Sequence, residues 1–163
     1  MKTNIIFYLL FFLVLVNSCV KKPDFPIEPK LEFIRLDKNT MSQGDLNTDS
    51  ITVYLKFTDG DGDIGFDTKD SLQNLFVIDS RTGNFAERIK IPKLPDLGIG
   101  NGVSGEIELL LYTTCCLYKD NIPPCSVIDN IKYDTLTYKI FLVDRANHSS
   151  DTIETTPIIL RCE

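Results

Sequence analysis

Apolar and polar residues alternate along much of the chain between residues 30 and 163. In the clearest stretch, polar or aromatic residues separate Ile51, Val53, Leu55 and Phe57, and this period of two indicates a half-buried strand. The same pattern predicts six further strands, at residues 31–36, 75–79, 88–91, 107–113, 136–143 and 152–160. Turns rich in Gly, Asn and Asp lie between them, at residues 59–65, 82–84, 98–105 and 146–147.

This pattern determines the fold class that we expect. Seven short strands joined by turns are typical of an antiparallel β-sandwich, and no alternation of strands with helices suggests a parallel α/β sheet. Residues 30–163 have the usual size of one domain. We therefore expect an all-β chain with a single antiparallel sandwich of about seven strands.

The segment from Tyr138 to Ser149 resembles the penultimate strand and hairpin turn of exported bacterial immunoglobulin-like and fibronectin-III-like domains. In those domains a Tyr-x-apolar-x-apolar strand leads into an Asp-Arg-Ala-Gly-Asn-x-Ser turn. Here the Gly is missing, and Asn147 follows Ala146 directly. Asn tolerates the left-handed conformation, so the turn can still form. The resemblance implies an immunoglobulin-like sandwich and says little about function, because this architecture has unrelated roles.

The N-terminus has a positive charge at Lys2, an apolar run from Ile5 to Val16 and a small residue, Ser18, before Cys19. This order is typical of a secretory signal peptide, and the run is shorter than the roughly 20 residues of a spanning helix. The segment also resembles the lipobox of bacterial (bacteroidete-type) lipoproteins, which implies cleavage before Cys19 and lipidation of that residue. The alternative is an ordinary signal peptide that contains a cysteine.

The expected organisation has three parts: a signal peptide at residues 1–18, a lipidated tether at residues 19–29 and the sandwich at residues 30–163. Three prolines in the tether favour an extended chain of roughly 3 Å per residue. Val20 stands where Asp would indicate retention at the inner membrane, so we expect a lipid anchor in the outer membrane. The sequence leaves open whether the domain is on the periplasmic or the cell-surface face.

Charge excludes one class of partner. The chain has 17 Lys and Arg against 23 Asp and Glu, a net charge of −6, and loss of residues 1–18 would make it −7. An acidic chain without a basic cluster is a poor ligand for phosphate backbones, so nucleic acid is not an expected partner.

The loop at residues 59–70 has a high density of acidic residues, and its sequence is DGDGDIGFDTKD. Its acidic positions 1, 3, 5, 9 and 12, with a backbone carbonyl at position 7, match the ligand spacing of a Ca²⁺ loop. Position 6 is Ile64, where an EF-hand has Gly, and the flanks are strands, so we expect a calcium loop of another type. The alternative is an Asp-Gly turn with solvated carboxylates. The candidate ligands are Asp59, Asp61, Asp63, Asp67 and Asp70.

Four cysteines remain besides Cys19, and an even number in an exported chain indicates disulfides. Cys115 and Cys116 are adjacent, so each is expected to take a different partner. Alternation continued from the preceding strand points Cys115 inward, toward Cys162, and leaves Cys116 for Cys125. A zinc site is the alternative, but the cysteines lack its paired C-x2–4-C spacing.

Three other patterns have structural explanations. Residues 100–105 fit G-x-G-x-x-G, but a strand follows them instead of the helix that a dinucleotide site requires. His148 is followed by Ser149, Ser150 and Asp151, and neighbours in one turn cannot form a catalytic triad. Glu106 and Glu108 lie about 7 Å apart on one strand, as a glycosidase pair does, and exposed strand faces carry such pairs routinely.

Together these observations predict a membrane-anchored envelope lipoprotein that is not an enzyme. We expect a binding or scaffolding module for an envelope protein or a glycan, stabilised by Ca²⁺, with recognition in the loops at residues 59–70 and 98–105. Two alternatives remain: a metal-dependent hydrolase or enzyme accessory that uses the acidic loop, and a structural envelope component in which calcium stiffens one loop.

Overall fold

The computed structural model describes residues 24–94 and 102–163. Within these ranges the chain is all-β, with ten strands and no helix, which confirms the predicted all-β class. The predicted signal peptide, Cys19 and the first part of the tether lie outside the described residues. The strands are β1 (Lys30–Leu36), β2 (Thr40–Ser42), β3 (Ser50–Asp59), β4 (Leu75–Asp79), β5 (Phe85–Ile89), β6 (Val103–Tyr112), β7 (Tyr133–Leu136), β8 (Tyr138–Leu142), β9 (Ile153–Glu154) and β10 (Ile158–Arg161).

Among the described residues, no helix has the length and apolar character that crossing a membrane would require.

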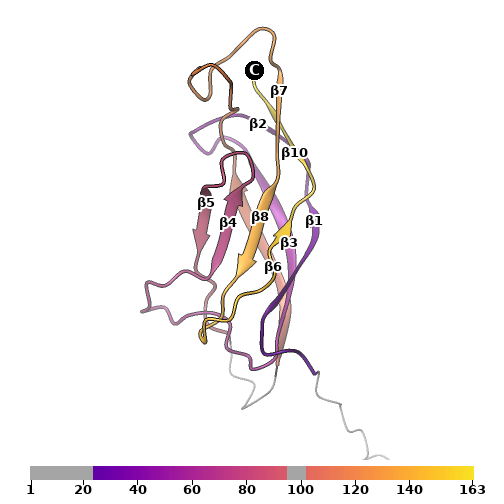
Figure 1. The fold of residues 1–163 in the computed structure, drawn as a ribbon, viewed down its shortest axis with the longest axis vertical. Coiled ribbons are helices and arrows are strands. Elements are labelled where there is room, and N and C mark those ends of the chain that lie inside the picture. The colour runs from indigo at the N-terminus through magenta and orange to yellow at the C-terminus, as the bar shows by residue number, and fades with distance from the viewer. Residues whose placement is uncertain (1–23, 95–101) are drawn as a thin grey trace, which may run out of the picture.

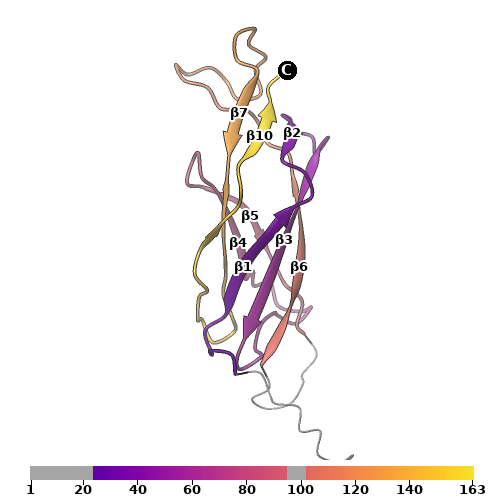
Figure 2. The same cartoon turned by 90° about the vertical axis from the view of Figure 1, so that its right-hand side faces the viewer.

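The strands form two layers that face each other along an elongated molecule (Figures 1 and 2). One layer is the antiparallel sheet β1-β3-β6, and the other contains the antiparallel sheet β5-β4-β8-β9. A third sheet, β2-β10-β7, lies toward the C-terminal pole, and its β2 runs parallel to β10. Only Thr137 separates β7 of the third sheet from β8 of the second, so the chain passes from one sheet to the other without a loop.

The core lies between the layers and follows from the alternation of each strand. Every second residue of β3 is buried, and the same holds for β4 and β8. Removing each such side chain from water contributes about 1.5–3 kcal/mol. The fully buried core side chains of these three strands are Ile51, Val53, Leu55, Leu75, Val77, Ile140 and Leu142.

The described residues form ten strands where the pattern predicts seven. The predicted strand at residues 136–143 is interrupted at Thr137, whose backbone N–H and C=O bond to Ser80 instead of a neighbouring strand. The predicted strand at residues 152–160 is interrupted before Pro157, which has no N–H to donate to a sheet. The three-residue β2 is too short for alternation to reveal it. β6 already begins at Val103, inside the segment predicted as a loop at residues 98–105.

Both disulfides lie at the C-terminal pole of the molecule. Cys115 bonds to Cys125, and Cys116 bonds to Cys162, so the predicted pairing of Cys115 with Cys162 is wrong. β6 ends at Tyr112, and its alternation does not continue to the cysteines. Cys116 is therefore the buried member of the adjacent pair, and it meets Cys162, which is buried after the last strand.

The two disulfides should contribute unequally to stability. The sequence separations are 46 residues for Cys116–Cys162 and 10 for Cys115–Cys125. In the chain-entropy model these loops correspond to about 4 and about 3 kcal/mol. We expect the double Ala variant of Cys116 and Cys162 to lose more unfolding free energy in urea than the double Ala variant of Cys115 and Cys125. A larger loss from the shorter loop would contradict this order.

Candidate metal site

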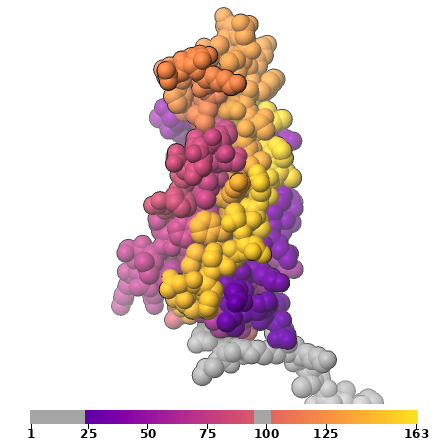
Figure 3. Space-filling model, viewed as in Figure 1, coloured from indigo at the N-terminus to yellow at the C-terminus, as the bar shows by residue number. Residues whose placement is uncertain are grey.

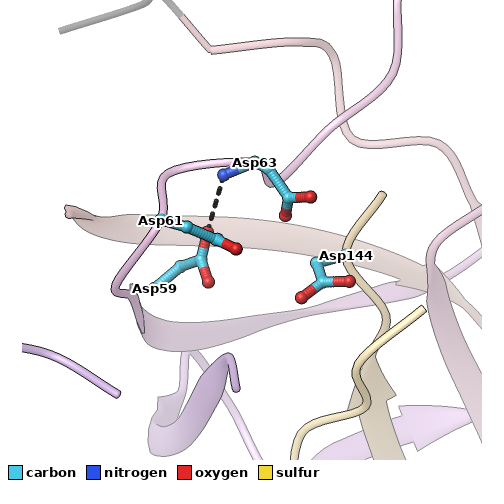
Figure 4. A group of neighbouring side chains, drawn as sticks. All are labelled: Asp59, Asp61, Asp63 and Asp144. Carbon is cyan, nitrogen blue, oxygen red and sulfur yellow. Dashed lines mark hydrogen bonds between the residues drawn. The ribbon is translucent and has the colours of Figure 1, made fainter. Parts of the chain in front are cut away.

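Four carboxylates converge at the end of the molecule opposite the disulfides (Figure 4). Asp59 is the last residue of β3, Asp61 and Asp63 follow in the next loop, and Asp144 comes two residues after β8. One oxygen from each carboxylate lies within 4.8 Å of the others. The group therefore combines residues from both layers, and the sequence separation of Asp63 and Asp144 is 81.

Strand alternation places two of these carboxylates in the interior. Inward positions of β3 continue from Phe57 to Asp59, and Asp59 has no exposed surface. Inward positions of β8 continue past Leu142 to Asp144, which is 1% exposed. Each strand thus extends its buried face by one position beyond the apolar core, and in each case that position is an aspartate.

Local hydrogen bonds fix the loop that follows β3. The backbone N–H of Asp63 donates to Oδ2 of Asp59 at 2.8 Å (Figure 4). Gly62 has a φ of 74°, in the left-handed region that glycine adopts without strain. This turn brings the half-buried Asp63 and the exposed Asp61 back over the buried carboxylate of Asp59.

A second turn holds Asp144. Its Oδ1 accepts the backbone N–H of His148 at 2.8 Å, and its Oδ2 lies 2.8 Å from Nδ1 of His148. Asn147 has a φ of 69°, so Asn does occupy the left-handed position of this hairpin turn. The hydrogen bond to Asp144 raises the pKa of His148. His148 is thus tied to a carboxylate of the group and is not arranged as part of a triad with its sequence neighbours.

The site concentrates negative charge that the protein only partly compensates. Oδ1 of Asp59 and Oδ1 of Asp63 are buried and accept no hydrogen bond within the described part of the chain. Burial, followed by the charges of Asp61, Asp63 and Asp144, raises the pKa of Asp59 to about 6 from its ordinary value of 3.8. Burial and the charges of Asp144 and Asp61 also raise the pKa of Asp63.

Asp79, the other buried aspartate at a strand end, has a cationic partner within the chain. Asp79 ends β4 and is 8% exposed, and Arg81 contacts it at 2.6 Å. Arg81 also reaches Asp134 at 2.6 Å and donates to the carbonyl of Cys115 at 3.1 Å. Every charge there has an opposite partner at hydrogen-bond distance.

Apart from His148, which forms an ion pair with Asp144 when it is protonated, the acidic group has no basic partner within 4.0 Å among the described residues. Arg145 lies nearby and lowers the pKa of Asp63, but its guanidinium donates to the carbonyl of Gly65 at 3.0 Å. The described residues contain no ion pair within 4.0 Å between Arg145 and any of the four carboxylates. The carbonyl of Gly65, at position 7 of the predicted loop, is thus occupied by Arg145.

The oxygen spacing fits a hard divalent cation. Ca²⁺ is bound by oxygens at about 2.3–2.6 Å, so ligands on opposite sides of the ion lie about 4.6–5.2 Å apart. The separations of up to 4.8 Å in this group fall within that limit. Carboxylate oxygens are ligands that Ca²⁺, Mg²⁺ and Mn²⁺ prefer, and the group offers four of them.

Two of the five predicted ligands lie outside this group. Asp67 and Asp70 form a turn of their own, in which the N–H of Asp67 donates to Oδ2 of Asp70 at 3.2 Å. The N–H of Asp70 donates back to the carbonyl of Asp67 at 3.0 Å. Asp144 takes part instead. Its signal in the sequence was the alternation of Tyr138, Ile140 and Leu142, which continues to residue 144.

The chain enters the domain beside this site. A side chain at Gly60 would collide with the backbone of Phe25 and Pro26, so glycine is required for this close approach. A Cβ at Gly102 would lie 2.9 Å from the ring of Phe25 and 2.9 Å from the carbonyl oxygen of Asp59. The last residues of the predicted tether are thus packed against the loop that carries the acidic group.

Comparisons with known proteins give no further assignment. No family model matches the chain, no curated protein matches its sequence, and no solved structure matches its fold.

The raised pKa of Asp59 predicts how the metal-free protein responds to pH. Between about pH 4 and 6 the folded state holds a proton that the unfolded state releases, so stability falls as the pH rises through this range. The raised pKa of His148 acts in the same direction as the pH rises above the ordinary His value of 6.5. We expect the melting temperature in chelator to rise when the pH is lowered from 7.5 to 5. A melting temperature that stays constant or falls when the pH is lowered would contradict the raised pKa of Asp59.

Two substitutions at the opposite ends of the sandwich should change stability in opposite directions. Asp59→Asn keeps an acceptor for the N–H of Asp63 and removes the buried charge, so we expect a higher melting temperature in chelator. Arg81→Met leaves Asp79 buried without its partner, and we expect a loss of about 3–5 kcal/mol of unfolding free energy. Urea unfolding of both variants at pH 7.5 measures the contrast, and destabilisation by Asp59→Asn would contradict it.

Proposed function

We propose that this protein is a lipid-anchored envelope module: an immunoglobulin-like sandwich that Ca²⁺ stabilises at its membrane-proximal end and that binds a partner without catalysis. The observation that carries the proposal is the buried carboxylate of Asp59, which lies among three other aspartates with no cationic side chain bound to it within the described part of the chain.

The strand order supports the immunoglobulin-like class. Immunoglobulin domains contain strands A, B, E and D in one sheet and G, F and C in the other, to which variable domains add C′. β1, β3 and β6 correspond to A, B and E in this scheme. β9, β8, β4 and β5 correspond to G, F, C and C′. Among the described residues, no strand takes the place of D beside β6.

Calcium is the cation that this site suits best. The group places up to four negative charges around one point, and Ca²⁺ accepts six to eight oxygens in flexible geometry, whereas Mg²⁺ demands a near-ideal octahedron. Asp61 is exposed and Asp63 is half-buried, so water can complete the coordination from the solvent side. Binding would remove the desolvation cost of Asp59, and its free energy would therefore add to the stability of the fold.

The surroundings of the site favour a structural ion over a catalytic one. A catalytic metal needs an adjoining space for substrate. The hollows of the described residues include four with volumes of about 300 to 530 Å³. None of the four aspartates lines any of these, which favours the structural ion over the metal-dependent hydrolase.

The position of the site fits an anchored domain. The described chain starts beside the acidic group, at the pole opposite the C-terminus, and Phe25 and Pro26 lie against Gly60 (Figure 1). The lipobox-like segment at Cys19 precedes this contact by only a few residues. An ion bound at the group would thus stiffen the part of the domain from which the tether leaves.

Calcium titration of the full chain in mild detergent, after treatment with chelator, tests the proposal. We expect saturable binding by calorimetry and a melting temperature that rises with Ca²⁺. Asp59→Asn and Asp144→Asn should each weaken binding at least tenfold, because each removes a charged ligand from the buried part of the site.

The matched controls come from the same loop. Asp67→Asn and Asp70→Asn remove equal charge a few residues away, and we expect them to change the affinity less than twofold. Equal losses from all four substitutions would indicate only diffuse attraction of cations to an acidic loop. No heat and no change in melting temperature would refute the calcium site.

A further inference from the structure

One edge of β6 is unpaired within the described part of the chain. β6 pairs with β3 along all ten of its residues, and no other strand of the described chain pairs with its second side. The backbone N–H of Thr113 donates to the carbonyl of Asp49 at 2.9 Å, which fixes the parity of this ladder. Odd-numbered residues of β6 therefore bond to β3, and even-numbered residues point their N–H and C=O groups away from it. These residues are Ser104, Glu106, Glu108, Leu110 and Tyr112.

A groove lies beside this edge, between the two layers. Its volume is about 330 Å³, and β6 contributes Ile107 and Leu109 to it, while β5 contributes Ile89. Further apolar walls come from Phe57, Ile91 and Leu94. Ile89, Leu94 and Ile107 are only half-buried, so the core is incompletely covered where the two layers separate.

The side chains along the edge set the charge of any strand that pairs with it. Glu106 and Glu108 are exposed and border the groove. Neither is in an ion pair within 4.0 Å among the described residues, although Lys56 lies opposite Glu106 in the register. The one lysine that borders the groove, Lys90, donates to the carbonyl of Asp70 and is held on the other wall.

We propose that the free edge of β6 binds an extended segment of a partner protein as an added strand, with apolar side chains in the groove and Lys or Arg side chains beside Glu106 and Glu108. Strand addition uses backbone bonds for affinity and alternate side chains for specificity. An added strand points every second side chain into the groove and the others to solvent. Opposite charges across neighbouring strands stabilise the pair, and like charges destabilise it.

The same charges argue against a second copy of this chain as the occupant. Antiparallel pairing of two β6 strands about Ile107 would place Glu106 of each copy opposite Glu108 of the other. Pairing about Glu106 or Glu108 would place a glutamate opposite itself. Pairing about Leu109 avoids this conflict but limits the ladder to residues 106–112 and places no positive charge opposite either glutamate, so a basic partner suits the free edge better.

A blocked ten-residue peptide of alternating Val and Lys is the probe, and a peptide of alternating Val and Glu is its matched control. Both are added to the full chain in mild detergent, and amide exchange is followed residue by residue. We expect the Val-Lys peptide to bind and to slow exchange at the even-numbered amides of β6. The odd-numbered amides already bond to β3 and should change little.

Charge reversal completes the test. Glu106→Lys with Glu108→Lys alters only exposed side chains, and we expect it to weaken the Val-Lys peptide at least tenfold and to favour the Val-Glu peptide. Binding of the peptide without protection of the even-numbered amides would overturn the proposal, since it would show charge attraction alone. Absence of binding at millimolar peptide would also overturn it. Protection of the same amides by raised protein concentration alone would assign the edge to self-association instead.

Discussion

β3 runs between two neighbours through the length of its sheet, and its inward side chains must be covered by β4 and β8 for the chain to fold. The opposite layer supplies its core residues to meet this requirement, and β1 and β6 pair with β3 on its two edges. The same burial also has an energetic cost, because the inward face of β3 continues beyond Phe57. The next inward residue is Asp59, and a charged group in that position needs compensation.

The protein deals with buried aspartates in two different ways. In the half of the molecule toward the C-terminal pole, Asp79 is paired within the chain, because Arg81 contacts both Asp79 and Asp134. Figure 3 shows one face of the whole molecule, with the C-terminal pole at the top. At the other pole Asp59 and Asp144 face each other across the two layers, and more acidic groups are added to them. The first arrangement depends on no solute, whereas the second makes the free energy of folding depend on protons and on cations in the surroundings.

Alternation in the sequence was sufficient to predict β1, β3, β4 and most of β6, because each has one face in the core. It failed where the backbone leaves its strand. Thr137 and Pro157 interrupt predicted strands, and the end of β6 at Tyr112 reverses which neighbouring cysteine is buried.

The acidic site was predicted in part, since loop spacing indicated Asp59, Asp61 and Asp63. Asp144 required knowledge of which strands of the two layers end beside each other, although the parity of β8 already placed it inward.

The adjacent cysteines have a consequence for a chain that is cut. Residues 117–161, which include β7, β8, β9 and β10, lie between the two ends of the Cys116–Cys162 bond. A protease that cleaves one peptide bond anywhere in this third of the chain therefore releases no fragment, because both new ends stay attached through sulfur. The exposed segment around Ile122 is also enclosed by the Cys115–Cys125 ring. A molecule nicked there keeps all of its strands for as long as its thiols remain oxidised.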